Sequence, residues 1–293
     1  MGKPRLMSVC PACGARLSTG LRTWHLRCSS CTYEGSSLEP HILEQAQGGD
    51  LDEASREKGL EHLRQANFQR LFALLRGFAA AGDAKARLLE VGCAHGWFIQ
   101  TVSPSFEVTG IEPDVAVATA TRARGLPVLG GFFPQALDAG DRFDVIVFND
   151  VLEHIPDVNA TLAACGHHLA PGGRIVVNAP SRRGFLYRVS KLLARAGLAG
   201  SFERRWQLGF PSPHVHYFDT ASITRLAGKA GFTLESRTHL PSVAVRGLYA
   251  RVRYSREVPV AKAIFLTMAV TLMAPLLRVL PPDIEVWILR RPS

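Results

Sequence analysis

From residue 87 onward, short apolar runs alternate with segments in which apolar residues recur every three or four positions. The short runs are rich in Val, Ile and Phe, as buried strands are, and the segments between them have helical periodicity. This alternation predicts parallel strands joined by crossover helices, an α/β doubly wound fold with ligands bound at the carboxyl ends of the strands. The expected strands are RLLEVG (87–92), FEVTGIE (106–112), LPVLGG (126–131), FDVIVFN (143–149), GRIVVNAP (173–180), FTLESRT (232–238) and IEVWILR (284–290). The expected helices between them span 96–103, 115–124, 158–169 and 220–230.

A further amphipathic helix is expected at 58–79, ahead of the first of these strands. Its apolar residues are Leu60, Leu63, Leu71, Leu74 and Phe78, with Arg and Gln between them. The polar, glycine-containing stretch 42–57 before this helix predicts a linker.

Two Cys-x2-Cys pairs lie near the beginning of the sequence, separated by fourteen residues and each set in a tight turn. Tetrahedral zinc takes four thiolates from two short loops and needs no large apolar core around it. The spacing therefore predicts a structural zinc ribbon over 1–41, with His25 as a less favoured substitute for one ligand. The predicted ligands are Cys10, Cys13, Cys28 and Cys31.

The composition indicates a folded protein of a reducing compartment. A length of 293 residues allows one large domain and a small module, and 47% hydrophobic with 20% charged residues excludes a disordered chain. Six cysteines, four of them in the metal pattern, favour a reducing compartment over a disulfide framework. No apolar run precedes the first cysteine, so we expect no signal peptide and a cytoplasmic location.

The first predicted strand runs into a glycine-bearing turn, Glu90-Val-Gly92-Cys-Ala94-His-Gly96, and the second strand ends at Glu112. Small residues in such a turn let the backbone approach a ligand, and the acid closing the second strand can accept hydrogen bonds from ribose hydroxyls. The spacing by itself suits a nucleotide-like cofactor, NAD included. The alternative is a glycine turn that serves only packing.

The acid-x-G-x-A-x-G spacing is followed by FDVIVFNDVLEHIPD and LAPGGRIVVNAP. With these motifs, residues 58–239 and the last strand resemble class I S-adenosylmethionine-dependent methyltransferases, in the branch that includes ubiquinone-biosynthesis O-methyltransferases and sugar methyltransferases. The resemblance implies a seven-stranded Rossmann-like domain over 58–293 that binds S-adenosylmethionine. It implies cofactor contacts from Glu90, Gly92, Ala94, Gly96, Glu112, Asn149 and Asp150, and adenine contact from backbone groups with Phe132 or Phe133.

A hydroxyl acceptor also needs a base. His154, in DVLEHIPD, lies where the resembling enzymes place side chains beside the transferred methyl group, and imidazole titrates near neutral pH. We predict that His154 is the catalytic residue. The alternative is a structural role for His154, as a helix cap or in packing. His214 and His216 are candidates for substrate contact. Cys93 and Cys165 are expected to be buried apolar fillers.

The net charge of +9 comes from two segments that interrupt the expected fold, 181–215 and 240–283. Residues 185–196 predict a basic amphipathic helix, and 263–277 are uncharged throughout. One membrane crossing would put the last strand on the wrong side, so a transmembrane span is rejected. The alternatives for the second helix are an interfacial helix, a homodimer or lid surface, and core. We favour peripheral contact with the inner face of the membrane through 184–199 and 262–278.

The leading function is methyl transfer to a hydroxyl of a small or lipid-linked metabolite or glycan. An RNA base methyltransferase with a zinc recognition module is the main enzymatic alternative, but the ribbon's modest charge and the apolar insertions do not favour nucleic acid. A non-catalytic adaptor that binds the cofactor is the third interpretation.

Overall fold

A twisted sheet of seven strands forms the centre of the molecule, in the order β10-β11-β8-β7-β4-β5-β6. In the computed structural model the described residues are 8–41, 53–78, 84–243, 245, 247–253, 258–277 and 279–292. The strands of this sheet are β4 (Ala86–Val91), β5 (Phe106–Glu112), β6 (Val128–Gly130), β7 (Phe143–Asn149), β8 (Leu169–Pro180), β10 (Thr233–Leu240) and β11 (Ile284–Arg290). These are the seven strands that the sequence predicts.

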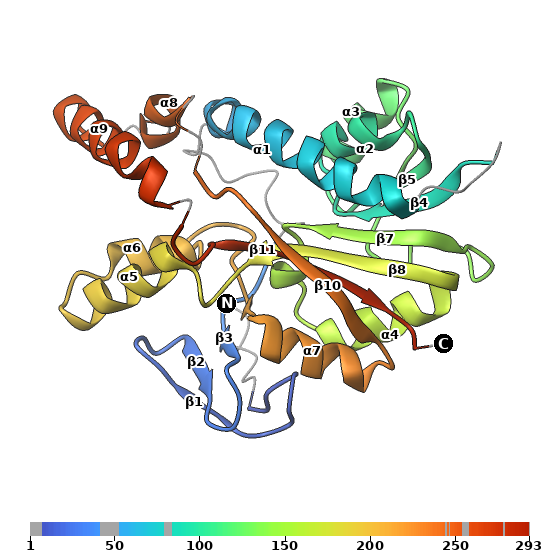
Figure 1. The fold of residues 1–293 in the computed structure, drawn as a ribbon, viewed down its shortest axis with the longest axis horizontal. Coiled ribbons are helices and arrows are strands. Elements are labelled where there is room, and N and C mark those ends of the chain that lie inside the picture. Colours follow the sequence, from blue (N-terminus) through green and yellow to red (C-terminus); the bar gives the residue numbers. More distant parts are fainter. Residues whose placement is uncertain are drawn as a thin grey trace.

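Helices cover both faces of this sheet, and each face has its own apolar core (Figure 1). One face carries α1 (Glu53–Leu75), α2 (Trp97–Val102) and α3 (Val115–Ala123), and the other carries α4 (Val158–His168) and α7 (Thr220–Lys229). Strands β4, β5, β6, β7 and β8 are parallel, whereas β11 is antiparallel to both β8 and β10. Strands of a sheet that is covered on both faces have nearly continuous apolar sequences. These apolar runs are the pattern from which the strands were predicted. The α/β doubly wound prediction is confirmed.

Helix α1 starts earlier than expected. It begins at Glu53, so residues 53–57 of the predicted linker are helical, and the linker residues 42–52 lie outside the described residues. The predicted domain boundaries stay predictions.

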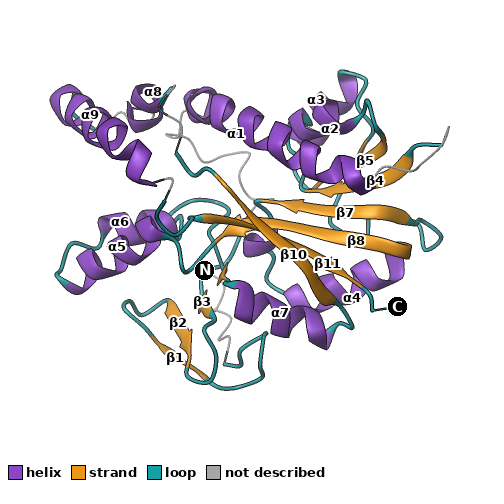
Figure 2. Cartoon of the chain, in the orientation of Figure 1, coloured by secondary structure: helices purple, strands orange, loops and turns teal. Residues whose placement is uncertain are grey.

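The N-terminal module forms part of a second, four-stranded sheet that extends into the large domain (Figure 2). Its strands are β1 (Leu17–Thr19), β2 (His25–Cys28), β3 (Glu34–Ser36) and β9 (His216–Tyr217). Strand β9 belongs to the segment between β8 and α7, and it pairs antiparallel with β3. Buried Cys10, Ala12 and Tyr33 share one apolar core with α4 and α7. The module is therefore packed into the fold and does not hang from a linker.

Glu34 on β3 is the buried acid at this junction, with 3% of its surface exposed. Its carboxylate accepts hydrogen bonds from His25 at 3.2 Å and from the Tyr187 hydroxyl at 2.6 Å. It is also paired with the guanidinium of Arg182, at 3.2 Å, and with Lys191. Burial by itself would raise the pKa of Glu34, but the His25 hydrogen bond and the Lys191 charge lower it well below 4.5.

The two inserted segments hold helices of opposite character. The first contains α5 (Phe185–Arg195) and α6 (Gly200–Arg205), and the second contains α8 (Leu248–Arg253) and α9 (Val260–Leu277). Helix α9 is long and apolar enough to cross a membrane, and it is the one helix of this kind among the described residues. Only Ala263 of α9 is buried, so the structure does not support the core alternative for this segment.

We expect the substitution Glu34→Gln to destabilise the fold by about 3–5 kcal/mol at neutral pH, because it leaves the half-buried Lys191 ammonium without a counter-charge and leaves Arg182 with Asp219 alone. The carboxylate has a lowered pKa, so its contribution is complete above the unfolded value of 4.5 and is lost as pH falls below it. Urea unfolding of both proteins at pH 7 and at acid pH measures this. A difference in free energy of unfolding that grows on acidification would contradict the assignment.

Candidate functional site

The turn after β4 has the backbone geometry of a ligand cradle. Gly92, Ala94 and Gly96 all have positive φ, at 73°, 44° and 71°. A Cβ on Gly92 would lie 2.6 Å from Val151, and one on Gly96 would lie 2.6 Å from Leu126, so both positions require glycine. Ala94 takes the same left-handed conformation at some cost in strain.

Glu112, at the end of β5, holds this turn in place. One of its carboxylate oxygens accepts from the Ala94 amide at 2.8 Å, and the other accepts from the Asp114 amide at 2.9 Å. Burial raises the pKa of Glu112, and the two amides oppose that rise. Each oxygen has a second lone pair, so the carboxylate can bind ribose hydroxyls while it continues to fix the turn.

Glu90 is a buried acid beneath the turn, with 3% of its surface exposed. Asn149, at the end of β7, hydrogen-bonds to its carboxylate and accepts in turn from Asn178 at 2.5 Å. The Oε2 atom of Glu90 has no hydrogen-bond partner in the structure. Burial raises the pKa of Glu90 well above 4.5, with Glu112 adding to the effect. A cationic group such as the ammonium of S-adenosylmethionine would satisfy this carboxylate, so the site fits that cofactor.

Asp150 and Glu153 follow β7 as a pair of acids, of which Asp150 is half-buried and Glu153 is buried. Asp150 has a φ of 55°, and its amide donates to Asn178 O at 2.9 Å. Burial raises the pKa of Asp150, opposed by the charge of Arg64 on α1, and raises that of Glu153 well above 4.5. The Oε2 atom of Glu153 also has no hydrogen-bond partner. The site thus contains several acids whose pKa is raised by burial.

His154 ends η3 (Leu152–His154), directly after these acids. Its Nδ1 lies 3.0 Å from the carbonyl oxygen of Pro213, which can only accept, so Nδ1 carries the proton. The lone pair is then on Nε2, which lies 4.0 Å from Glu153 Oε1. Donor atoms of Glu153, His154 and His214 lie within 4.8 Å of one another, a group able to hold a proton or a divalent cation.

The two other predicted histidines have different surroundings. The ring of His214 is 4.7 Å from that of His154, centroid to centroid, and its Nε2 accepts from the Gln207 amide at 2.9 Å. His216 is fully buried, donates to Ile155 O at 2.9 Å and bonds to the Tyr33 hydroxyl. Burial lowers the pKa of His216 to about 4. His214 therefore remains the candidate for substrate contact, and His216 is a neutral positioning residue.

The loop that carries these histidines is held from two sides. The amide of Val215 donates to Glu153 O at 2.8 Å, and its carbonyl accepts from the Ser36 amide at 3.0 Å. The Ser36 hydroxyl also donates to His214 O at 2.8 Å. The N-terminal module thus reaches the segment that positions His154. Sequence reasoning missed this link because the residues are far apart in the chain.

The four cysteines of the N-terminal module form one cluster. Their Sγ atoms all lie within 4.8 Å of one another, with 3.6 Å between Cys10 and Cys31 and 3.4 Å between Cys13 and Cys28. Thiolates at about 2.3 Å from a tetrahedral zinc are about 3.8 Å apart, so the cluster fits the metal. Cys93 and Cys165 are buried at 5% and 0% exposure, as predicted.

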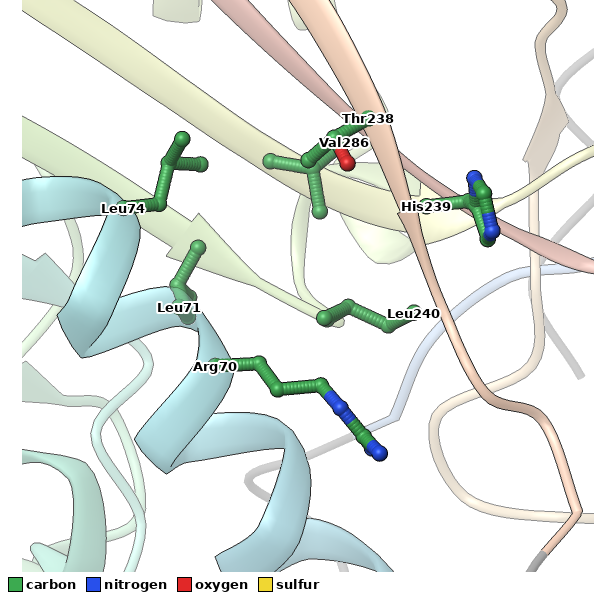
Figure 3. A pocket seen from close by; sticks show the side chains of 7 residues that line it. All are labelled: Arg70, Leu71, Leu74, Thr238, His239, Leu240 and Val286. Carbon is green, nitrogen blue, oxygen red and sulfur yellow. The ribbon is translucent and has the colours of Figure 1, made fainter.

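A separate cavity of about 300 Å³ lies between α1 and the β10–β11 edge of the sheet (Figure 3). Leu71, Leu74, Leu240 and Val286 form its apolar wall, and the side chains of Arg70 and His239 lie around it. None of the predicted cofactor residues lines it. Phe132, predicted for adenine contact, is 46% exposed beyond β6.

Comparison with known proteins agrees with this geometry. A family model described as a methyltransferase domain matches residues 60–237. The ubiquinone biosynthesis O-methyltransferase of Mesorhizobium japonicum is 30% identical over 159 residues, covering 52% of this chain and 61% of the relative. That of Paramagnetospirillum magneticum is 36% identical over 114 residues, covering 37% and 44%. The chain thus spans less than two thirds of the length of these relatives.

Solved structures show the same fold at low sequence identity. The cyclopropane synthase MmaA2 from Mycobacterium tuberculosis has a TM-score of 0.51 at 20% identity, covering 75% of this chain and 82% of that one. The mycolic acid cyclopropane synthase CmaA1, solved with SAH and CTAB, has a TM-score of 0.54 at 16% identity, covering 87% and 90%. Because the family match spans more than half of the chain and the sheet has the corresponding topology, the chain belongs to the class I S-adenosylmethionine-dependent methyltransferase family.

Proposed function

We propose that this protein transfers a methyl group from S-adenosylmethionine to a hydroxyl of a small or lipid-linked metabolite or glycan. The observation that carries the proposal is the cradle at the ends of β4 and β5. There Glu112 fixes a turn with three positive-φ residues, and the buried Glu90 carboxylate has an oxygen without a partner. The O-methyltransferase relatives support a hydroxyl acceptor.

Each residue of the cradle has a distinct role in this proposal. Glu112 accepts from the ribose hydroxyls, Gly92 and Gly96 let the backbone approach, and Glu90 with Asn149 and Asp150 binds the cationic methionine end. The bound cofactor would supply a methyl group on positively charged sulfur, so that an aligned acceptor oxygen could bond to the methyl carbon as the carbon–sulfur bond breaks and the neutral thioether leaves. The protein contributes to the rate by aligning the acceptor and excluding water, in addition to supplying a base.

His154 acts as the general base in this proposal. Its Nδ1–H bond to Pro213 O fixes the ring, and the Nε2 lone pair receives the proton from the acceptor hydroxyl. Glu153, 4.0 Å away, stabilises the imidazolium that forms. His214 adjoins this pair and contacts the acceptor. The cysteine cluster binds one structural zinc, which keeps the module folded and so holds the loop around Val215.

His154→Ala tests the function directly. We expect turnover to fall about 10²- to 10⁴-fold, the usual contribution of a general base, while affinity for S-adenosylmethionine is unchanged. The assay is incubation with radiolabelled cofactor and fractionated extract, which also reports whether label enters lipid, RNA, protein or small soluble material. The exposed His167 gives the matched control, His167→Ala, with full turnover. Unchanged turnover in His154→Ala would exclude the base, and label only in RNA would favour the nucleic-acid alternative.

Glu90→Gln should lower the affinity for S-adenosylmethionine but raise the stability of the protein without cofactor. Loss of the charge is expected to weaken S-adenosylmethionine binding about 10- to 100-fold, by calorimetry. Because burial raises the pKa of Glu90 above 4.5, the wild-type protein without cofactor loses stability as pH rises above that value. The variant lacks this loss, so it should have the higher melting temperature at pH 8. Glu107→Gln, at an exposed position of β5, should change neither quantity. Cofactor affinity equal to wild type would remove Glu90 from the site.

Removal of zinc should disturb the catalytic loop more than the cofactor cradle. After chelation we expect loss of one metal ion per chain by mass spectrometry and a change in the fluorescence of Trp24 and Trp206, which pack together. Turnover should fall with His154 displaced, whereas cofactor affinity should change little because the cradle lies on the central sheet. Equal loss of both properties would argue against a local effect through Val215.

A further inference from the structure

The two inserted segments leave the central sheet at one point. Ile284, the first residue of β11, pairs with Leu240 at the end of β10 and with Pro180 at the end of β8. The segment 181–215 therefore begins next to the point on the sheet where the segment 241–283 begins. The segment 241–283 also ends at this point. Paired residues are only about 5 Å apart, so a single membrane crossing by α9 is excluded.

Direct hydrogen bonds join the bases of the two segments. Both carboxylate oxygens of Asp283 accept from the first turn of α5, from the amides of Leu186 at 3.2 Å and Tyr187 at 3.0 Å. The Ser181 amide donates to Asp283 O at 2.9 Å. Asp283 is 8% exposed, and the acid at the N-terminus of α5 also complements the helix dipole. Helix α5 is thus positioned by the end of the segment that contains α9.

Helix α9 packs against α8 along one side and exposes large apolar residues along the other. Lys262 is the one charged residue within the helix. The exposed side chains are Val260 (50%), Ile264 (47%), Phe265 (69%), Met268 (61%), Leu272 (80%), Met273 (42%) and Leu276 (51%). An exposed apolar surface of this extent marks an interaction site in a soluble fold.

Helix α5 is oriented so that its apolar side faces outward. It packs into the protein through Tyr187, Ser190 and Ala194, although its apolar positions lie elsewhere on the helix. Leu192 is therefore 60% exposed and Leu193 38% exposed, and Leu198 beyond the helix is 65% exposed. The helix contains three basic residues, of which Lys191 is paired with Glu34.

Arg188 and Arg195 are the two remaining basic residues of α5, and both are exposed. Neither α5 nor α9 contains an acid, and Glu203 of α6 is paired with Arg22 at 3.0 Å. The outward surface of these helices therefore combines apolar and basic side chains without acidic ones.

We propose that the exposed sides of α5 and α9, here called the α5/α9 surface, dock the enzyme on an anionic lipid bilayer. Apolar side chains enter the boundary between headgroups and acyl chains, while Arg188, Arg195 and Lys262 pair with lipid phosphates. A second copy of the chain is a poorer occupant, because a two-fold interface places this basic surface against itself.

The location of the α5/α9 surface suits delivery of the acceptor from the bilayer to the site. This part of the proposal rests on the proposed function. Both segments emerge at the carboxyl end of β8, the edge of the sheet at which β7 leads into His154. Figure 1 shows α5 and α9 projecting beyond that end of the sheet. An amphiphilic acceptor would then reach the site from the bilayer, with its hydroxyl at the headgroup level.

Flotation of the metal-replete full chain with vesicles tests the surface. The probes are phosphatidylcholine vesicles with and without phosphatidylglycerol, each at low and high salt. We expect binding to the anionic vesicles at low salt, weakened by salt. Arg188→Glu with Arg195→Glu should reduce the partition coefficient about tenfold or more, and Phe265→Glu with Leu272→Glu by more than about tenfold.

Matched controls separate the surface from general effects. Phe265→Leu with Leu272→Met keeps the apolar character, and Arg142→Glu changes an exposed charge before β7, so both should float like the wild type. No flotation of the wild type at low salt, or flotation that neither double variant reduces, would overturn the proposal. So would a dimer in light scattering that Leu272→Glu converts to a monomer.

Cofactor binding to each variant, measured by equilibrium dialysis, distinguishes the two proposals. In the double variants, loss of flotation with intact S-adenosylmethionine binding is the expected result. A wild-type protein that binds S-adenosylmethionine but does not float contradicts the docking surface alone. Flotation with no cofactor binding by the wild type contradicts the proposed function instead.

Discussion

The buried carboxylate of Glu34 fixes the relation between the N-terminal module and the rest of the chain. It comes from β3, and its partners come from β2 and from the segment that contains α5. A buried charge is tolerated only when its hydrogen-bonding capacity is filled, so this one arrangement is strongly favoured over a loose one. The aromatic cluster of Trp24, Phe202 and Trp206 packs around the same junction and excludes water from it. The module is consequently a structural part of the domain.

This junction has consequences for the segment that lies against His154. Strand β9 is only two residues long, and a strand of that length is not stable alone. It exists because β3 pairs with one side of it, while Val215 and His216 bond to η3 and Ile155 on the other. The N-terminal module therefore supports the backbone that orients His154. The cofactor cradle depends on different interactions, the Glu112 hydrogen bonds and the two glycines, and these lie on the central sheet.

Burial also explains the electrostatics of the site. Glu90, Asp150 and Glu153 lie at or after the ends of β4 and β7, and burial raises the pKa of each. Glu90 and Glu153 each have one carboxylate oxygen without a hydrogen-bond partner. Such an arrangement is unfavourable for the protein alone and becomes favourable when a cation binds among the acids. Buried carboxyl groups thus have two opposite roles in this protein, in the Glu34 junction and in the acids of the site. The first stabilises the fold, and the second reserves interaction energy for a ligand.

The sequence alone determined the seven strands of the central sheet, the helices between them, the glycine turn and the cysteine cluster, but not β9, α6 or α8. These features depend on neighbouring residues, because apolar runs, positive-φ glycines and paired thiolates follow local rules. Only the tertiary structure decided which histidine lies beside His154, that Lys191 pairs with Glu34, and that α5 has its apolar side outward. Each of these depends on contacts between residues far apart in the chain: His216 bonds to Tyr33, and Asp283 fixes the first turn of α5. Periodicity specifies which residues share one side of a helix, but only long-range packing specifies which side is covered.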